Sequence, residues 1–315
     1  MPAQRQTRNC ALGMLAAGVL VAGFRSRAKP KRARDDRASS RQAPHVKAAQ
    51  RLNRAAGLIS TSTLLDSGME HYRGSYRNKA MFTPLIVSAL TLGVSLHGTT
   101  DKHAATHKFR HATYAAAALT GFVGTLFHLY NVGKRPGGFS WQNLFHGSPL
   151  GAPAAVGLAG LLGYYSEKLR DNVTGKMPRV FGVSAGRALA ALTSLGLVAT
   201  SCEAALLHFR GAYHDPFMYV PVTVPPVAAV LLAETATTRP RPPRRFTRWW
   251  LRLTAAVGFA GAAFHVFGIH RMMGGWRNWS QNLLNGPPVP APPSFTGLAL
   301  AGLAALGLLE DHPDV

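Results

Sequence analysis

The chain has 315 residues, of which 47% are hydrophobic and 15% are charged, and its formal net charge is +22. A soluble protein of this charge would be expected to bind nucleic acid. Several long apolar stretches instead predict an integral membrane protein, with the lipid bilayer as its first partner and no nucleic-acid partner. The sequence contains no phosphate-binding loop, G-x-S-x-G elbow, HExxH helix or Rossmann fingerprint, so a self-contained hydrolase or ATPase is not expected.

Residues 1–50 divide into a short apolar segment and a basic linker. Two arginines precede the apolar run 10–24 in the manner of a signal peptide, yet no small-x-small cleavage site follows before the basic block. Because this run is short for a membrane span, we expect an interfacial or partly inserted segment. A signal peptide, a ninth span and a misassigned start codon are the alternatives. Residues 25–50, rich in Arg, Lys, Ser, Ala and Pro, predict a disordered linker.

Membrane-spanning helices are predicted from seven apolar stretches of about 16 to 21 residues, close to the roughly 20 that cross a hydrocarbon core. These stretches are residues 80–97, 112–132, 150–165, 188–207, 216–233, 253–269 and 293–309. An eighth segment, 55–72, is short and polar, and only the internal repeat described next identifies it as a span. We predict an all-α polytopic protein with eight core helices, four in residues 51–170 and four in residues 171–315.

The second half of the chain repeats residues of the first half at a constant displacement of 137 positions. The repeated residues are His71, Arg73, Gly74, Tyr76, Met81 and Pro84, which recur as His208, Arg210, Gly211, Tyr213, Met218 and Pro221, and Gly121, Phe122, Gly124, Phe127 and His128, which recur as Gly258, Phe259, Gly261, Phe264 and His265. This pattern indicates a tandem duplication. Since each copy has an even number of spans, we predict parallel repeats related by a pseudo-twofold axis along the membrane normal.

Basic residues are distributed unevenly between alternate loops. Twenty-five Lys and Arg residues fall in 25–54, 98–111, 166–187 and 236–252, against eight in the intervening loops. The positive-inside rule places the first set in the cytoplasm. We therefore predict a multi-pass protein of a bacterial-type cytoplasmic (inner) membrane, with both ends of the eight-helix core and the short acidic tail cytoplasmic. The repeated polar residues then lie near the extracytoplasmic face.

In the third helix of each copy, two glycines and a histidine share one helical face. The two sets, spaced i, i+3 and i+7, are Gly121, Gly124 and His128, and Gly258, Gly261 and His265. One interpretation is a small-residue seam for close helix packing, with the histidine hydrogen-bonded to a neighbouring carbonyl. The other is a cofactor site, in which the glycines clear space for a flat group and the histidine ligates it, as imidazole ligates haem iron.

The first helix of each copy ends in the pattern His-aromatic-Arg-Gly-x-Tyr. Its histidine is expected at a depth similar to that of the third-helix histidine. The arginine two positions on either anchors the helix to lipid head groups or binds a propionate or phosphate through its guanidinium fork. The predicted cofactor site comprises His71, His128, His208 and His265 as metal ligands, Arg73, Arg210, Gly124 and Gly261 around them, and Tyr76 and Tyr213 as polar neighbours.

Acidic residues also recur, as Asp66 and Glu203, each seven positions before its arginine. A direct pair would require the arginine to fold back over two helical turns, about 10.5 Å. A carboxylate within a membrane is costly, so each of these groups is either functional, as counter-ion, proton relay or ligand, or satisfied by a structural partner. Glu70 has no acidic counterpart and is the weaker candidate.

Methionine and proline follow the histidine in both copies. Met81 and Met218 are either packing residues or, with imidazole, ligands for Cu(I). Pro84 and Pro221 are expected to kink the second helix near its outer end and to open a pocket there.

Three further histidines, His103, His107 and His111, have the i, i+4, i+8 spacing of one helical face. The second copy lacks them and contains a run of prolines and arginines instead. We therefore expect a solvated basic loop at these positions.

These observations favour a membrane or anchor subunit of an extracytoplasmic redox complex. It would bind a cofactor, with b-type haem first, copper as the alternative and no cofactor as the third case, and would exchange electrons with an extracytoplasmic redox protein. The first alternative is a small-molecule or ion transporter, against which no charged residue is expected in the inner half of the spans. The second is a non-catalytic scaffold or assembly protein.

Overall fold

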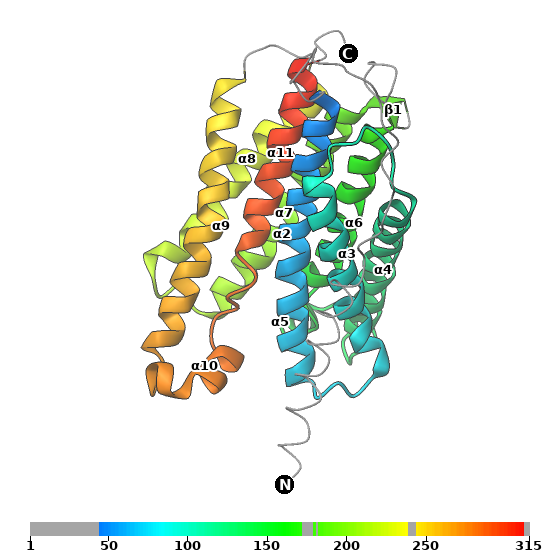
Figure 1. The fold of residues 1–315 in the computed structure, drawn as a ribbon. Coiled ribbons are helices and arrows are strands. Elements are labelled where there is room, and N and C mark those ends of the chain that lie inside the picture. Colours follow the sequence, from blue (N-terminus) through cyan, green and yellow to red (C-terminus); the bar gives the residue numbers. More distant parts are fainter. Residues whose placement is uncertain (1–43, 172–178, 181, 239–243, 312–315) are drawn as a thin grey trace. The chain divides into compact units, whose positions relative to one another are not determined.

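The computed structural model describes residues 44–171, 179–180, 182–238 and 244–311. The N-terminal apolar segment and most of the expected linker lie outside these residues. Within them the chain is all-α, as predicted, apart from one antiparallel hairpin of two short strands, β1 (Arg179–Val180) and β2 (Val183–Ser184) (Figure 1).

The described part contains eight helices of at least 18 residues. They are α2 (Pro44–Arg73), α3 (Thr83–Thr100), α4 (Lys108–Gly133) and α6 (Gly151–Arg170) in the first half, and α7 (Ala185–Arg210), α8 (Val220–Thr237), α9 (Arg245–Arg271) and α11 (Pro293–Asp311) in the second. Short helices lie between them: η1 (Lys79–Phe82), α5 (Trp141–Phe145), η2 (Pro216–Tyr219), η3 (Gly275–Asn278) and α10 (Trp279–Asn285).

Six of the long helices are long and apolar enough to cross a membrane. These are α3 and α8, each together with the 3₁₀ turn before it, and α4, α7, α9 and α11. The protein therefore has the character of a multi-pass helical membrane protein. Helices α2 and α6 do not reach the same hydropathy, although the stretch 150–165 within α6 is among those from which a span is predicted.

The low hydropathy of α2 follows from its position. It packs against α3, α6 and α11, and its buried residues include Ser60, Ser62, Thr63 and Ser67. Small residues allow helix backbones to approach closely, and their hydroxyls bond neighbouring groups; Ser62, for example, hydrogen-bonds the Ser294 hydroxyl of α11 at 2.8 Å. A helix enclosed by other helices need not be apolar on every face. Hydropathy alone therefore does not identify such a helix as a membrane span.

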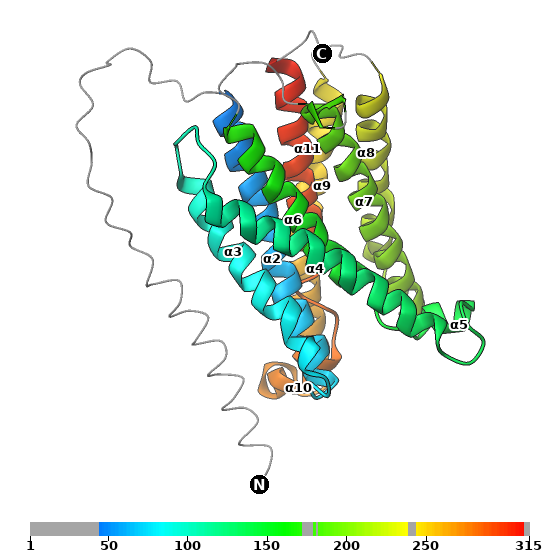
Figure 2. The ribbon, with the colours of Figure 1, turned by 90° about the vertical axis from the view of Figure 1, so that its right-hand side faces the viewer.

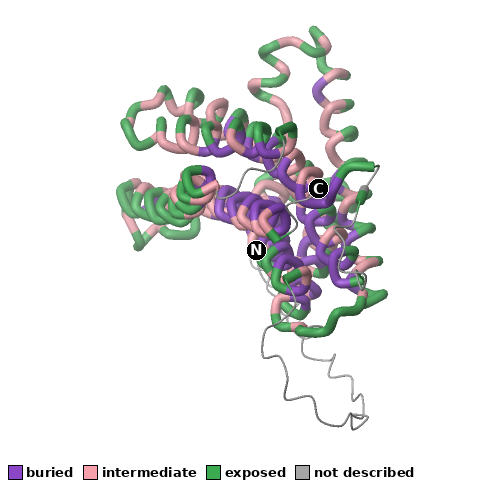
Figure 3. Tube along the Cα trace, turned by 90° about the horizontal axis from the view of Figure 1, so that it is seen from above, coloured by how far each residue is buried: buried purple, intermediate pink, exposed green. Residues whose placement is uncertain are grey.

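The most buried of the six apolar helices is α11. Of its most apolar window, 67% is buried, against 17% for α4. It packs against α2, α7 and α9, and the buried positions gather in the middle of the bundle (Figure 3). The peripheral helices expose large apolar side chains, including Leu119 and Phe122 on α4 and Phe259 on α9. Exposed apolar surface of this extent on six long helices is the pattern that lipid contact requires.

The two ends of the bundle differ in the segments they contain. Helix α2 begins and α11 finishes at the same end, called here the terminal end, where β1 and β2 also lie (Figure 1). The residues between α2 and η1 and the short helices α5 and α10 lie at the other, called here the turn end. Helix α4 crosses α6 obliquely on its way to α5 (Figure 2).

Local structure corrects several sequence predictions. Helix α2 begins at Pro44, so the last seven residues expected in the linker are helical. Pro84 and Pro221 stand in the first turn of α3 and α8, where a missing N–H breaks no helical hydrogen bond, and they do not kink a helix interior. The prediction of a proline kink at these positions is therefore wrong.

Candidate functional site

Helices α2 and α7 end in the same cross-connection to the following helix. The Nδ1 atom of His71 lies 2.6 Å from the backbone oxygen of Met81, and that of His208 lies 2.7 Å from the backbone oxygen of Met218. Each imidazole therefore ties the end of one helix to the 3₁₀ turn that begins the next. This contact explains why the histidine and the methionine recur ten positions apart in both halves.

The turn after each histidine has a strained backbone, again in both halves. Ser75 and Tyr76 have φ values of 56° and 47°, and Ala212 and Tyr213 have φ values of 56° and 46°. Such left-handed backbone is unfavourable for residues other than glycine. It is held by the tyrosine hydroxyls, which donate hydrogen bonds to the carbonyls of Gly68 at 3.2 Å and of the equivalent residue in α7 at 3.1 Å.

The third-helix histidines are held in the same way. Nδ1 of His128 lies 2.6 Å from the Pro149 carbonyl oxygen, and Nδ1 of His265 lies 2.8 Å from that of Pro288. A carbonyl oxygen only accepts hydrogen bonds, so Nδ1 donates in each case. The Nε2 atom of the neutral ring then keeps its lone pair, and this holds for all four repeated histidines.

Each half places its two repeated histidines at the turn end. His71 interacts electrostatically with His128, and His208 with His265. All four rings are partly buried at the turn end. The use of these four histidines as metal ligands stays a prediction.

The glycines of the third helix form a packing seam. A Cβ atom at Gly121 would overlap the backbone of Gly157 on α6. At Gly124 a Cβ would lie 3.1 Å from the Cβ of Pro153, and at Gly261 it would lie 2.9 Å from that of Pro292. The idea that Gly124 and Gly261 clear space for a flat cofactor is therefore wrong, because Pro153 of α6 and Pro292, the residue before α11, occupy that space.

The two repeated arginines have different partners. Arg73 forms an ion pair with Glu70, one helical turn away. The guanidinium of Arg210 lies 5.0 Å from the ring centroid of Phe145 in α5. The sequence ranks Glu70 below Asp66 as a candidate. In the structure Arg73 pairs with Glu70 and not with Asp66.

The two repeated acids lie at the contact between the halves. Glu203 accepts a hydrogen bond from the backbone N–H of Gly151 at 3.2 Å, so a side chain of α7 caps the first turn of α6. A carboxylate at a helix N-terminus is stabilised by the unpaired N–H groups there. Asp66 interacts electrostatically with Glu203 and with Arg73. Glu203 therefore has a structural partner, and Asp66 lies beside it.

No group of three or more His, Cys, Asp or Glu side chains suited to hold a metal ion occurs among the residues that the structure describes. The methionines are used for packing: the Cε atom of Met81 lies 3.0 Å from where a Cβ of Gly74 would be, and Met218 covers Gly211 at the same distance. Each half thus offers two imidazoles, with the thioether turned to a neighbouring glycine.

A buried ion network at the terminal end of the first half is missing from the sequence prediction. Arg110 donates to both carboxylate oxygens of Glu167, at 2.9 and 3.2 Å, and to Asp101 at 2.7 Å. Arg170 donates to the backbone carbonyls of Asp101 and His103, both at 3.0 Å. Arg110, Glu167 and Arg170 are fully buried. All of these charged residues lie beyond the apolar stretches from which spans are predicted, and their burial was not predicted.

The network fixes the connection between α3 and α4. The backbone N–H of His107 donates to Glu167 at 2.9 Å, and that of Thr106 donates to Asp171 at 2.8 Å. Burial raises the pKa of Asp101, but hydrogen bonds from the His103 backbone and from Arg110 outweigh burial and hold this pKa well below its usual range. Asp101 is therefore ionised in the folded protein at neutral pH.

The three histidines of this region do not share a helical face. His103 is exposed in the connection, His107 precedes α4, and His111 lies within α4 against the ring of Tyr164, with ring centroids 4.5 Å apart. The prediction of a solvated loop fits His103 and is wrong for His111.

No protein-family model, curated protein or solved structure matches the chain. The site is therefore interpreted from its own geometry.

Proposed function

We propose that the protein is a multi-pass subunit of a bacterial-type inner membrane, formed by two parallel copies of a four-helix unit. Support comes from the recurrence of the histidine, tyrosine and methionine contacts in both halves with nearly equal distances. Contacts in the helix seams recur as well: Gly163 faces Tyr114 in the first half, and Gly302 faces Leu251 in the second. In this proposal α2 and α6 cross the membrane with the six apolar helices, sheltered by their neighbours.

Each histidine pair, in this proposal, binds one b-type haem near the extracytoplasmic face. The observation that carries it is the common hydrogen bond from Nδ1 to a backbone carbonyl in His71, His128, His208 and His265. Metal-ligating histidines use this arrangement, because the bond at one nitrogen fixes the ring and leaves the other for the metal.

Two imidazoles per half favour haem over a bare metal ion. Haem iron brings four nitrogen ligands of its own and takes one or two axial ligands from the protein. A copper site would need more ligands, and the Met81 and Met218 side chains that could supply them pack on glycines. Arg73 and Arg210, at the same end, would meet haem propionates by exchanging their present contacts with Glu70 and Phe145. When bound, haem supplies one-electron redox chemistry.

The exposed aromatic residues at the turn end fit contact with a partner or with the membrane surface. Trp141 in α5, Trp276 in η3 and Trp279 in α10 are all more than half exposed. Tryptophan is common at membrane interfaces and at protein interfaces. We propose that α5 and α10 face an extracytoplasmic redox protein that exchanges electrons with the subunit.

Transport has less support from the contacts. The side chains that would line a path are engaged: Arg73 with Glu70, Arg210 with Phe145, and Glu203 with Gly151. Arg110, Asp101 and Glu167 of the buried ion network are enclosed within the first half and paired with one another. A scaffold function without a cofactor is the outcome if the spectra described next show no haem.

The test is a reduced-minus-oxidised absorption spectrum of the purified full chain, expressed in haem-replete cells. We expect b-type haem bands in the wild type and their reduction in His128→Ala and in His265→Ala. The matched controls are His146→Ala and His270→Ala, which remove exposed histidines at the same end. Absence of haem bands from the wild type would overturn the proposal. Equal loss in the control variants would overturn the assignment of the ligands.

A further inference from the structure

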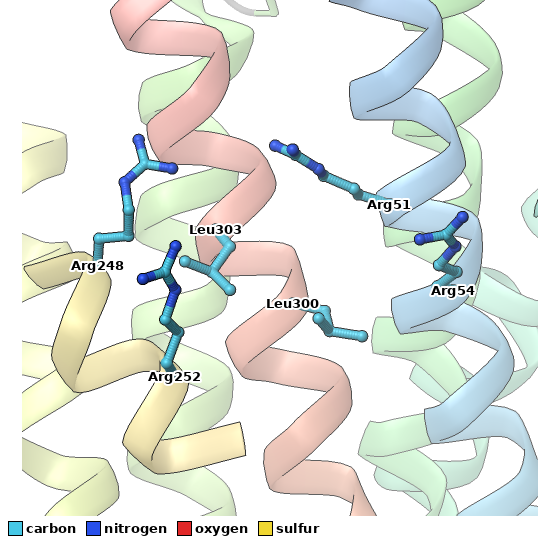
Figure 4. A pocket seen from close by; sticks show the side chains of 6 residues that line it. All are labelled: Arg51, Arg54, Arg248, Arg252, Leu300 and Leu303. Atoms are coloured by element: carbon cyan, nitrogen blue, oxygen red, sulfur yellow. The ribbon is translucent and has the colours of Figure 1, made fainter. Parts of the chain in front are cut away.

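Four arginines from two helices surround a hollow near the terminal end. Arg51 and Arg54 of α2 and Arg248 and Arg252 of α9 line it, with Leu300 and Leu303 of α11 (Figure 4). The hollow has a volume of about 170 Å³. Helices α2 and α9 do not belong to the same half, and both pack on α11. The repeated contacts of the turn end play no part in this site.

The spacing of the arginines directs each pair to one face of its helix. Arg51 and Arg54 are three positions apart, and Arg248 and Arg252 are four apart, so both members of each pair project to the same side. Figure 4 shows the two pairs on either side of α11. Gly307 helps to shape the site, because a Cβ there would lie only 3.2 Å from a terminal nitrogen of Arg51.

Among the residues that the structure describes, a single ion pair offsets the positive charge of the hollow. Arg248 forms an ion pair with Glu310. Arg51, Arg54 and Arg252 have no ion pair or hydrogen bond with any residue in the described ranges 44–171, 179–180, 182–238 and 244–311. Like charges held around one hollow repel each other unless an anion neutralises them. Arginine is also the side chain whose planar donors best match a phosphate.

The depth and the apolar floor indicate which anion is bound. Arg252 lies seven residues from the first residue of α9, about 10 Å along the helix, and Arg51 lies the same number of residues from the first residue of α2. Arg54 and Arg252 directly precede the predicted spans 55–72 and 253–269, where a headgroup region would pass into hydrocarbon. Leu300 and Leu303 continue the surface along α11 toward the middle of the bundle. A free phosphate would contact the arginines only, whereas a phospholipid would contact the arginines with its headgroup and the two leucines with its acyl chains.

We propose that this hollow binds an anionic phospholipid, with the four arginines contacting its phosphate headgroup and the acyl chains lying on Leu300 and Leu303. The lipid would join α2 of the first half to α9 of the second across α11. The site is distinct from the general attraction of a basic protein for anionic membranes, because it depends on four particular side chains and not on the net charge.

Native mass spectrometry of the full chain in detergent tests the proposal, with phosphatidylglycerol as the probe and phosphatidylcholine as the neutral comparison. The test variant changes Arg51, Arg54, Arg248 and Arg252 to Gln. The control changes Lys102, Lys108, Arg179 and Arg245 to Gln, which removes the same charge from exposed positions at the same end. We expect the test variant to weaken phosphatidylglycerol binding by about tenfold or more, since several charge-assisted contacts are lost, and the control by less than about threefold.

Two further measurements keep the outcome decisive. Glu310→Gln removes the acidic partner of Arg248 and should strengthen phosphatidylglycerol binding by about threefold, because one more guanidinium becomes available. Inorganic phosphate should compete poorly with a short-chain phosphatidylglycerol. Equal losses in the test and control variants, or equal competition by inorganic phosphate, would overturn the proposal; the second result would identify a site for free phosphate.

Discussion

At the terminal end, the two halves share the same helix packing but differ in the side chains that they bury. In the first half, Arg110, Glu167 and Arg170 are buried in an ion network. The helix contacts beside it recur in the second half, where Gly302 meets Leu251 as Gly163 meets Tyr114. The positions that correspond in this register are Thr247, Leu306 and Leu309, all buried and uncharged.

This difference shows that the helices do not need the ions in order to pack. The network instead holds the connection between α3 and α4, since Glu167 and Arg170 bond backbone atoms of His107 and His103. The turn ends show the opposite relation, because the hydrogen bonds of the repeated histidines and tyrosines recur in both halves. A contact kept in both copies points to a shared function, and one found in a single copy points to a local structural task.

The largest expected effect comes from breaking the network at its centre. Glu167→Leu leaves Arg110 and Arg170 buried without their carboxylate and should lower the free energy of unfolding by about 3–5 kcal/mol. Replacing the whole set by the residues of the second half, with Asp101→Thr, Arg110→Thr, Glu167→Leu and Arg170→Leu, should be less destabilising than the single change. Unfolding in detergent measures both. A combined variant less stable than Glu167→Leu would contradict this account of the network.

A pH-dependent effect is expected at Asp101. Its pKa is lowered in the folded state, so its contribution is complete above its ordinary pKa of about 4 and is lost as the pH falls through the folded value. Asp101→Asn should cost about 1.5–3 kcal/mol at pH 7 and flatten the loss of stability below pH 4. Unfolding measured at a series of pH values tests this, with the exposed Asp171→Asn as control. An unchanged acid slope in Asp101→Asn would refute it.

Substitutions at two glycines of the α4–α6 contact are expected to lower stability by a smaller amount, and by different amounts at the two positions. Gly121→Ala would place a Cβ against the Gly157 backbone, which cannot move aside, and should cost about 1–3 kcal/mol. Gly124→Ala meets the Cβ of Pro153 at 3.1 Å and should cost less than about 1 kcal/mol. Thermal unfolding in detergent compares them. If Gly124→Ala were the more damaging change, α6 would not pack as described.

The smallest expected effect is a gain in stability at the strained turns. Ser75→Gly and Ala212→Gly relieve left-handed backbone at equivalent positions and should each stabilise the protein by about 0.5–1 kcal/mol. Similar gains in the two halves are expected because the turns have the same φ values. A clear loss of stability in both variants would show that this turn conformation is not the one adopted in solution.

Hydropathy was sufficient to predict the all-α class and the six apolar helices, which are six of the seven stretches from which spans are predicted. The sequence also suggested the packing role of the third-helix glycines as one of two interpretations. These features depend on local pattern or on recurrence, both of which a single sequence displays. The recurrence also drew attention to Glu203, although not to the cap it forms on α6.

The ion network was not predictable in the same way. Arg110, Glu167 and Arg170 lie beyond the apolar stretches, where a basic residue ordinarily faces water, and they have no charged counterpart in the second half. Their burial depends on the extension of α4 and α6 past the apolar windows and on the packing of α2 against α6. Tertiary contacts of this kind leave no periodic signal. The pairing of Arg73 with Glu70 was missed because Glu70 is not repeated.

The measurement that tests the central proposal most directly is haem content per chain in variants that remove one histidine pair at a time. We predict two haems in the wild type, one in the double variant His71→Ala/His128→Ala and one in His208→Ala/His265→Ala, with none when all four are changed. Haem and iron contents of the purified full chain give these numbers. A wild-type protein free of haem, or a content unchanged when all four histidines are replaced, would contradict the proposal.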